Sequence, residues 1–438
     1  MVVYMIDEIK NKTGNSKDLV IRELDICNEK VSLLFFETLC DTKNINDFIL
    51  EYLSYLKINK KISLNIKDYI KKYIPTYKII EVKTIDEILK YLFSGFAILN
   101  VGNTYYAMEF KRSLDSGIMK VENEKTIKGP KDAFTENYQT NIGLIRKRIR
   151  NENLFLKEVT VGKKSSTKVG ILYMNDIANT NFVEKIVDRI ENIDIDSIPD
   201  SNYIYEYISN NKSLFPSVLS TERPDLVSFK LLNGKVAIVV DNTPYVILLP
   251  AFYIALITYN HEILPPSLVI NFAMQKEGVP FPTILEAIIM NITFEILRET
   301  DIRAPSALGS ALSIVGALVL GDAAVKAGLV SPIMVIVIAI TAISVLIFSV
   351  NDVSNAVKIW RIIFIIFASI SGILGVFIAL ILLICELNSI SSFGFPFMYP
   401  LSPLDIKDQG NDIVLTKNYK MQYRNKLTAK KNIRRGVL

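Results

Sequence analysis

Apolar and polar positions follow two different patterns along this chain. Residues 31–37 (VSLLFFE) and 169–175 (VGILYMN) are short apolar runs of the kind that form buried β-strands. Each run is followed by a segment with apolar residues at helical spacing, 45–56 (INDFILEYLSYL) and 181–193 (NFVEKIVDRIENI). The first half of the chain is therefore predicted to combine strands and helices.

Two hairpin-like segments repeat in the same register, residues 95–109 (GFAILNVGNTYYAME) and 234–248 (GKVAIVVDNTPYVIL). They are offset by 139 residues (234 − 95), and the strand runs by 138 (169 − 31). Both hairpins turn at a polar tip, Gly102-Asn103-Thr104 and Asp241-Asn242-Thr243, and glycine and asparagine tolerate the positive φ that such turns need. This repeat predicts two α/β subdomains, residues 1–153 and 154–249.

A predicted helix with a basic last turn separates the two copies, within residues 129–150 (GPKDAFTENYQTNIGLIRKRIR). Pro130 stands near its predicted start. Arg146, Lys147, Arg148 and Arg150 either complement the negative C-terminal end of the helix or contact anionic lipid or a partner subunit.

The second half of the chain has long apolar runs. Residues 330–350 form a run of 21 without charge, and residues 362–385 form a run of 24. A membrane-spanning helix needs about 20 apolar residues, so both runs are candidate spans. Residues 306–324 are a third, weaker candidate. The sequence predicts an all-α polytopic membrane domain, residues 250–404, with about four spans of which the first is short. A basic tail, residues 405–438, follows.

Small residues mark the 306–324 segment. They indicate either tight helix–helix packing or the lining of a narrow pore, in which a ring of valines could gate by dewetting. The candidate pore-lining residues are Ser306, Ser310, Ser313, Val315, Ala317 and Val319. Asp322 and Lys326, four residues apart, are predicted to form an ion pair at the end of this span.

Three carboxylates interrupt the apolar stretch at residues 280–300, namely Glu286, Glu295 and Glu299. Glu295 and Glu299 share one face of the predicted helix with Arg298 near Glu295, whereas Glu286 lies on nearly the opposite face. An ionised carboxylate is costly inside a bilayer, so these groups are either paired or hydrogen-bonded within the bundle or gathered at a cation-attracting pore mouth.

The distribution of charge separates the regions. Residues 1–243 hold 35 Lys and Arg against 33 Asp and Glu, residues 244–404 hold 6 against 9, and residues 405–438 hold 9 against 3. We expect the charged N-terminal half and the basic tail to be cytoplasmic. The basic excess is confined to the tail, so no nucleic-acid partner is expected. The unpaired spacing of Cys27, Cys40 and Cys385 favours reduced thiols.

Enzyme signatures are absent from the sequence. It contains one histidine, no phosphate-binding loop and no dinucleotide-binding motif. We therefore expect no catalytic site, no cofactor and no metal site.

Five long motifs closely resemble the A-subunit family of bacterial spore germination receptors, the GerA family. They are residues 129–149, 220–225 (STERPD), 279–299, 313–332 (SIVGALVLGDAAVKAGLVSP) and 392–404 (SFGFPFMYPLSPL). The resemblance implies the A subunit of a nutrient receptor in the spore inner membrane. It further implies a homo-oligomer, a pentamer, that forms a nutrient-gated cation channel triggering germination.

The resemblance also implies partners: a transporter-like B subunit, a C-subunit lipoprotein and membrane lipid. The alternative is a non-conducting membrane scaffold that couples the sensing subunit to a separate channel. One departure from the family pattern is the lack of a connector between residues 245–249 and the short apolar segment at 251–259. Either the strand at 245–249 is given up to lengthen the first span, or that span is incomplete.

Overall fold

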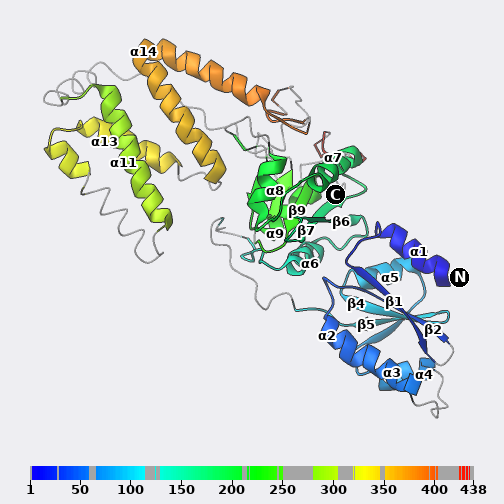
Figure 1. Cartoon of the computed structure of the whole chain (residues 1–438). Helices are drawn as coiled ribbons and strands as arrows, with labels where there is room; N and C mark the ends of the chain where they lie inside the picture. The colour runs from blue at the N-terminus through cyan, green and yellow to red at the C-terminus, as the bar shows by residue number, and fades with distance from the viewer. Residues whose placement is uncertain are drawn as a thin grey trace. The chain divides into compact units, whose positions relative to one another are not determined.

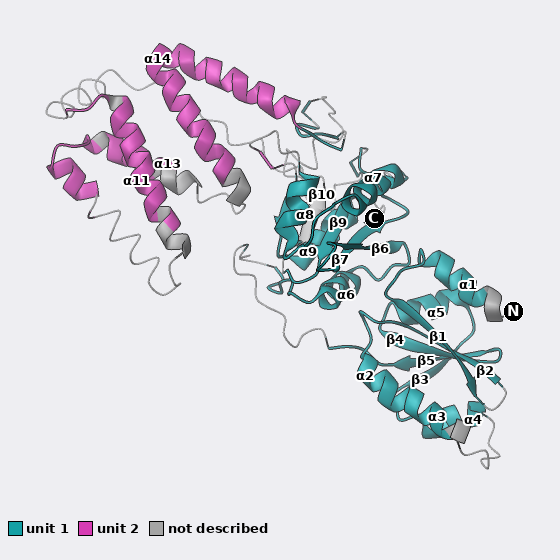
Figure 2. Cartoon of the chain, viewed as in Figure 1, with its two compact units in different colours: residues 1–211, 217–253, 391–438 teal, residues 212–216, 254–390 magenta. Residues whose placement is uncertain are grey.

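A computed structural model of the chain forms two compact units (Figures 1 and 2). Unit 1 comprises Met1–Asn211, Ser217–Tyr253 and Ser391–Leu438, and unit 2 comprises Lys212–Pro216 and Ile254–Ile390. The structure describes residues 2–26, 29–58, 66–113, 124, 129–209, 215–216, 218–243, 246–249, 280–303, 319, 321–345, 351–393, 395–399, 401–402, 424–425, 427–429, 431–432 and 434.

The first sheet of unit 1 has five antiparallel strands in the order β1-β2-β4-β5-β3. Its strands are β1 (Leu19–Ile26), β2 (Glu29–Phe36), β3 (Ile79–Val82), β4 (Phe96–Val101) and β5 (Thr104–Glu109). Successive side chains of a strand point to opposite faces, so each face of this sheet has its own apolar core.

Helices cover both faces of the first sheet (Figure 1). On one face, Ile9 and Ile88 of the helices pack with Leu34 and Ile98 of the strands. On the other, Ile49 packs in one cluster with Leu33 and Leu99. The helices of the first face are α1 (Val2–Lys12) and α5 (Ile85–Leu92), and those of the second are α2 (Thr42–Ile45), the π-helix η1 (Asn46–Leu50), α3 (Glu51–Ile58) and α4 (Ile66–Tyr73).

The second sheet repeats the strand order of the first, β6-β7-β9-β10-β8. Its strands are β6 (Leu154–Val161), β7 (Thr167–Met174), β8 (Leu219–Thr221), β9 (Val236–Val240) and β10 (Val246–Leu249). Ile171 and Ile238 pack with Phe182 of α7 (Thr180–Glu191) and Ile204 of α8 (Ser201–Ile208). Helices α6 (Tyr138–Arg148) and α9 (Pro224–Leu231) contact each other and β9. The prediction of an α/β N-terminal half is confirmed.

The turn chemistry of the two hairpins agrees with the prediction from sequence. Gly102, between β4 and β5, has φ +60°, and Asn242, after β9, has φ +63°. Strand β10 pairs with both β9 and β8. The alternative in which this strand is given up to lengthen the first span is therefore wrong. The segment 251–259 lies outside the described residues.

Unit 2 is helical in its described part. Its helices are α11 (Thr283–Arg303), α13 (Pro332–Val345) and α14 (Asn351–Ser389). Helix α11 contacts both α13 and α14, and Met290, Val330 and Ile338 form a small apolar core. Among the residues searched, one helix, Asn355–Ser389, is long and apolar enough to cross a membrane. The four spans and the membrane domain as a whole remain predictions.

Helix α14 is broken inside the span predicted for residues 362–385 (Figure 1). Ser371 has φ −131° and ψ 15°, and Gly372 has φ 56° and ψ −136°. The conformation of Gly372 is one that residues with a Cβ rarely adopt. A Cβ on Gly375 would lie 1.9 Å from the carbonyl oxygen of Phe367. The prediction of one continuous helix is thus corrected, because two glycines permit a sharp bend there.

The chain returns to unit 1 after α14 as a short hairpin of β11 (Ser391–Ser392) and β12 (Phe395–Pro396). The rings of Phe393 and Phe395 pack edge-on against Phe182 of α7. The guanidinium of Arg189 lies 4.4 Å from the Phe393 ring centroid. The segment that follows unit 2 is therefore held against the second sheet's helices.

Candidate functional site

The side chain of Glu286, in α11, is fully buried and lies beside the first residues of α13. Its Oε2 accepts hydrogen bonds from the backbone N–H of Ser331 at 3.0 Å and from the Ser331 hydroxyl at 3.0 Å. Ser331 immediately precedes α13, where backbone N–H groups lack partners within the helix. Glu286 thus acts as a capping acceptor for a neighbouring helix. Its other oxygen, Oε1, has no hydrogen-bond partner within the described part of the chain.

Glu295 of α11 forms an ion pair with Lys358 of α14. Both side chains are only partly exposed, and the pair links two helices that sequence analysis did not connect. The predicted neighbour, Arg298, has a side chain outside the described set. Glu299 is exposed. Glu286 and Glu295 are therefore bonded within the chain, which favours internal pairing of these two carboxylates over an open, charged mouth.

The predicted pore-lining face falls largely outside the described residues. This applies to Ser306, Ser310, Ser313, Val315 and Ala317. Val319 is described, and 57% of it is exposed. Beyond it, the Lys326 ammonium and the Asp322 carboxylate form the predicted ion pair at 2.6 Å.

The outer surface of α14 is strongly apolar. Ile370 and Ile373, on either side of the break, are 76% and 77% exposed, and Leu374 and Phe377 are also exposed. Soluble monomeric proteins rarely expose contiguous apolar surface on this scale. Helices in lipid expose apolar side chains, as α14 does, and keep acidic groups bonded inside the protein, as Glu286 and Glu295 of α11 are.

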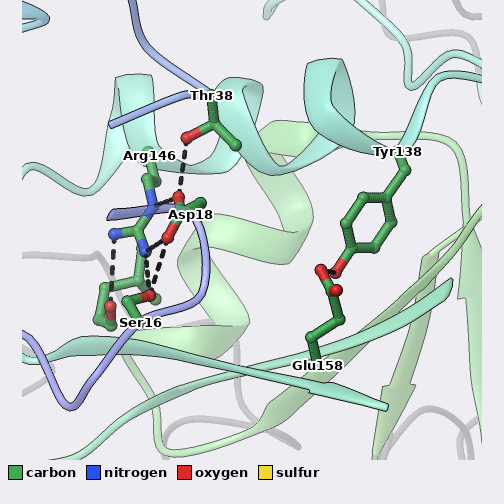
Figure 3. A network of polar contacts seen from close by, with 7 residues as sticks. Ser16, Asp18, Thr38, Tyr138, Arg146 and Glu158 are labelled. Carbon is green, nitrogen blue, oxygen red and sulfur yellow. Dashed lines mark hydrogen bonds and ion pairs between the residues drawn. The ribbon is translucent and has the colours of Figure 1, made fainter. Parts of the chain in front are cut away.

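A polar network surrounds Arg146 of α6 (Figure 3). Its Nε donates to Asp18 Oδ2 at 2.7 Å and its Nη2 to Asp18 Oδ1 at 2.9 Å. Nη2 also donates to Ser16 at 2.8 Å, and Thr38 donates to Asp18 at 2.8 Å. Arg146 is fully buried. Arg146 lies in the last turn of α6, as predicted, but its burial beside Asp18 excludes a contact with lipid.

The Arg146 network joins the two subdomains. Asp18, Ser16 and Thr38 belong to the first subdomain, whereas Arg146 also donates weakly to the carbonyl of Leu154, in β6 of the second sheet, at 3.4 Å. The guanidinium lies 4.6 Å from the ring centroid of Phe36 in β2. Sequence reasoning missed this junction, because Asp18 and Arg146 are 128 positions apart.

Tyr138 and Glu158 form a second junction on the same helix (Figure 3). The Tyr138 hydroxyl donates to Glu158 Oε2 at 3.0 Å, which ties α6 to β6. Burial, together with the nearby Glu158 carboxylate, raises the pKa of Tyr138. Gly170 of β7 makes room for this ring, since a Cβ there would lie 2.6 Å from the Tyr138 hydroxyl.

The STERPD motif, residues 220–225, bonds Glu124 at the end of β8. Thr221 donates to the Glu124 carboxylate, and Glu222 accepts from the backbone N–H of Glu124 at 2.8 Å. Arg223 and Asp225 form a two-point ion pair at the start of α9. Burial raises the pKa of Glu124. These contacts are internal to the fold and give the motif a structural role.

No group of three or more His, Cys, Asp or Glu side chains suited to a metal ion occurs among the residues searched. In the network around Arg146, the guanidinium donates to Asp18 and Ser16 inside the fold. What the described arrangement can do is fasten helices and subdomains to one another.

Comparison with known proteins matches the chain to a family of spore germination proteins. The family described as Bacillus/Clostridium GerA spore germination protein matches residues 7–252 and 246–427. The chain is 32% identical over 442 residues to spore germination protein KA of Bacillus subtilis, covering 91% of this chain and 81% of that protein. It is 29% identical to spore germination protein GerLA of Bacillus cereus, covering 94% and 92%.

Among solved structures, the N-terminal domain of the A subunit of the Bacillus megaterium spore germinant receptor GerK3 is 32% identical, with a TM-score of 0.44. The match covers 57% of this chain and 94% of the GerK3 domain. Both halves of the sequence match the family, including the segments that hold Arg146, Glu286 and the broken helix. The chain therefore belongs to the GerA family of spore germination proteins.

Proposed function

We propose that this chain is the A subunit of a nutrient germinant receptor and resides in the spore inner membrane. The family match over both halves of the chain is the observation that carries this proposal. The exposed apolar surface of α14 supports a position in lipid. In this proposal the subunit binds no cofactor, catalyses no reaction, and works with a transporter-like B subunit and a lipoprotein C subunit.

The finer proposal is that copies of the subunit assemble, as a pentamer, into a nutrient-gated cation channel. The small-residue segment 306–324 supports a close-packed pore, with Val315 or Val319 as the gate. The internal bonding of Glu286 and Glu295 favours a second candidate, a non-conducting scaffold. Carboxylates held by Ser331 and Lys358 leave less free charge to attract cations.

Ion flux from sealed liposomes distinguishes the two candidates. The purified subunit is reconstituted with and without its B subunit, and cation release is followed on adding nutrient. A channel gives nutrient-dependent flux with the B subunit, and Val319→Ala or Val315→Ala makes it leaky. A scaffold gives no flux in any of these samples, although the subunits still co-purify.

Glu286 gives a sharper control within the same assay. Glu286→Gln keeps an oxygen that accepts from Ser331 but removes the negative charge, whereas Glu286→Ala removes the acceptor. If Glu286 only caps α13, Glu286→Gln conducts like the wild type and Glu286→Ala loses assembly. Reduced cation flux through a fully assembled Glu286→Gln complex would instead assign Glu286 to the ion pathway.

A further inference from the structure

The end of the chain returns to the second subdomain and lies against two turns. The Arg424 Nε donates to the carbonyl of Leu232 at 2.8 Å, and the Thr428 hydroxyl donates to that of Asn233 at 3.1 Å. Lys431 reaches the other turn, where its Nζ donates to the carbonyl of Asn175 at 3.0 Å. Thr428 and Ala429 are almost fully buried. A tail rich in positive charge is thus held by backbone carbonyls and by packing.

The first subdomain contains the same two turns. After β2, the N–H groups of Leu39 and Cys40 donate to the carbonyl of Phe36. After β7, those of Ile177 and Ala178 donate to the carbonyl of Met174, 138 positions later in each case. The turn after α5 contains Gly95 with φ +80°, and the turn after α9 contains Gly234 with φ +82°.

Different parts of the chain fill the equivalent positions beside these turns. In the first subdomain, the segment directly after β5 does so: the N–H of Arg112 donates to the carbonyl of Leu39 at 2.9 Å. Lys111 lies against Gly95, with its Cγ 2.9 Å from where a Cβ would be. The residues after β5 are thus part of the first subdomain's fold.

In the second subdomain, the residues from Ile254 to Ile390 belong to unit 2. The tail takes the place beside the turns. The N–H of Lys431 contacts the carbonyl of Ile177 at 3.5 Å. A Cβ on Gly234 would lie 2.8 Å from the carbonyl oxygen of Thr428 and 3.1 Å from the Cα of Ala429.

We propose that residues 424–434, which follow unit 2 along the chain, are a structural part of the second α/β subdomain. They fill the position that residues 110–112 fill in the first subdomain. The second subdomain then holds unit 2 at both ends, through β10 before it and through the tail after it. This inference depends only on contacts within unit 1 and is independent of the channel proposal.

Limited trypsin digestion of the full-length chain tests the docking. Ala429→Arg inserts a charged side chain at a fully buried position, and Asn432→Arg inserts the same charge at an exposed one. We expect cleavage within residues 424–434 to be at least tenfold faster in Ala429→Arg and unchanged in Asn432→Arg. Each variant adds one trypsin site, so the sites of the wild-type sequence are the ones compared.

Hydrogen exchange separates release of the tail from general unfolding. In Ala429→Arg we expect faster exchange at residues 175–178 and 231–234, with β2 and β4 of the first sheet protected as in the wild type. If the variant does not fold, Thr428→Val replaces it, because valine lacks the hydroxyl that donates to Asn233, and we expect two- to threefold faster cleavage. Wild-type cleavage and exchange in whichever of these variants folds would overturn the proposal.

Discussion

At the residue scale, we expect the stability of unit 1 to depend strongly on the buried ion pair of Arg146 and Asp18. Removing one partner of a buried pair leaves the other charged and without compensation. We predict that Arg146→Met lowers the free energy of unfolding by about 3–5 kcal/mol, measured by urea denaturation of the purified chain.

Arg150, which donates to the carbonyl of Lys147 and is exposed, provides the control for this measurement. Arg150→Met should change the free energy of unfolding by less than about 0.5 kcal/mol. The double variant Asp18→Leu with Arg146→Met should recover part of the loss, because no buried charge then remains. An Arg146→Met chain as stable as the wild type would contradict a buried, coupled pair.

Cys40 offers a prediction about pH. It is buried, and this burial raises the pKa of the Cys40 thiol to about 12. The fold therefore favours the neutral thiol. The resulting stability is fully present below the pKa of an unfolded thiol, about 8.5, and is lost as the pH rises towards 12.

Alkylation measures this effect directly, since only the thiolate reacts. In a chain carrying Cys27→Ser and Cys385→Ser, we expect iodoacetamide at pH 8 to modify Cys40 at least about 100-fold more slowly in the folded state than in urea. Equal rates in the two states would show that Cys40 is accessible and its pKa ordinary.

At the element scale, the bend of α14 depends on Gly372 and Gly375. A straight helix from Asn355 to Asn388 would span about 50 Å, at about 1.5 Å per residue. Spin labels at these two exposed positions, in a chain without native cysteines, should report a shorter distance in the wild type. Gly372→Ala should move the distance towards the straight value, because alanine disfavours φ 56°. An unchanged distance would mean that packing, rather than glycine, maintains the bend.

Local determinants explain which elements the sequence predicted well. The hairpin turns depend on Gly102 and Asn242, whose positive φ is a property of the residues themselves. The break in α14 was missed because the apolar run of 24 residues draws attention away from its two glycines, Gly372 and Gly375. The start of α6 was placed too early, at Pro130, because Asn137 caps it through its contact with the Thr140 N–H.

The contacts of the candidate site could not be read from sequence. Glu286 meets Ser331 across 45 positions, and Lys358 meets Glu295 from another helix. Both partners are chemically ordinary residues at unremarkable spacings, so only the packing of α11 against α13 and α14 brings them together. The acidic residues were identifiable as unusual in an apolar region, but their partners were not.

At the scale of the whole molecule, the main segment of unit 2, Ile254–Ile390, lies between two segments of unit 1, Ser217–Tyr253 and Ser391–Leu438. A charged, folded unit does not lie on both sides of a bilayer. We predict an even number of membrane crossings. Single cysteines at Tyr77 and Asn432, both exposed, should react with a membrane-impermeant reagent from the same side of sealed vesicles. Labelling from opposite sides would contradict this topology.

The Arg146–Asp18 junction also limits how a stimulus can move the two α/β subdomains. Separating the two sheets would leave a buried guanidinium without its carboxylate, which costs much more free energy than sliding exposed surfaces past each other. A germination signal that reaches either sheet should therefore rotate both subdomains together as one rigid body, without opening a gap between them.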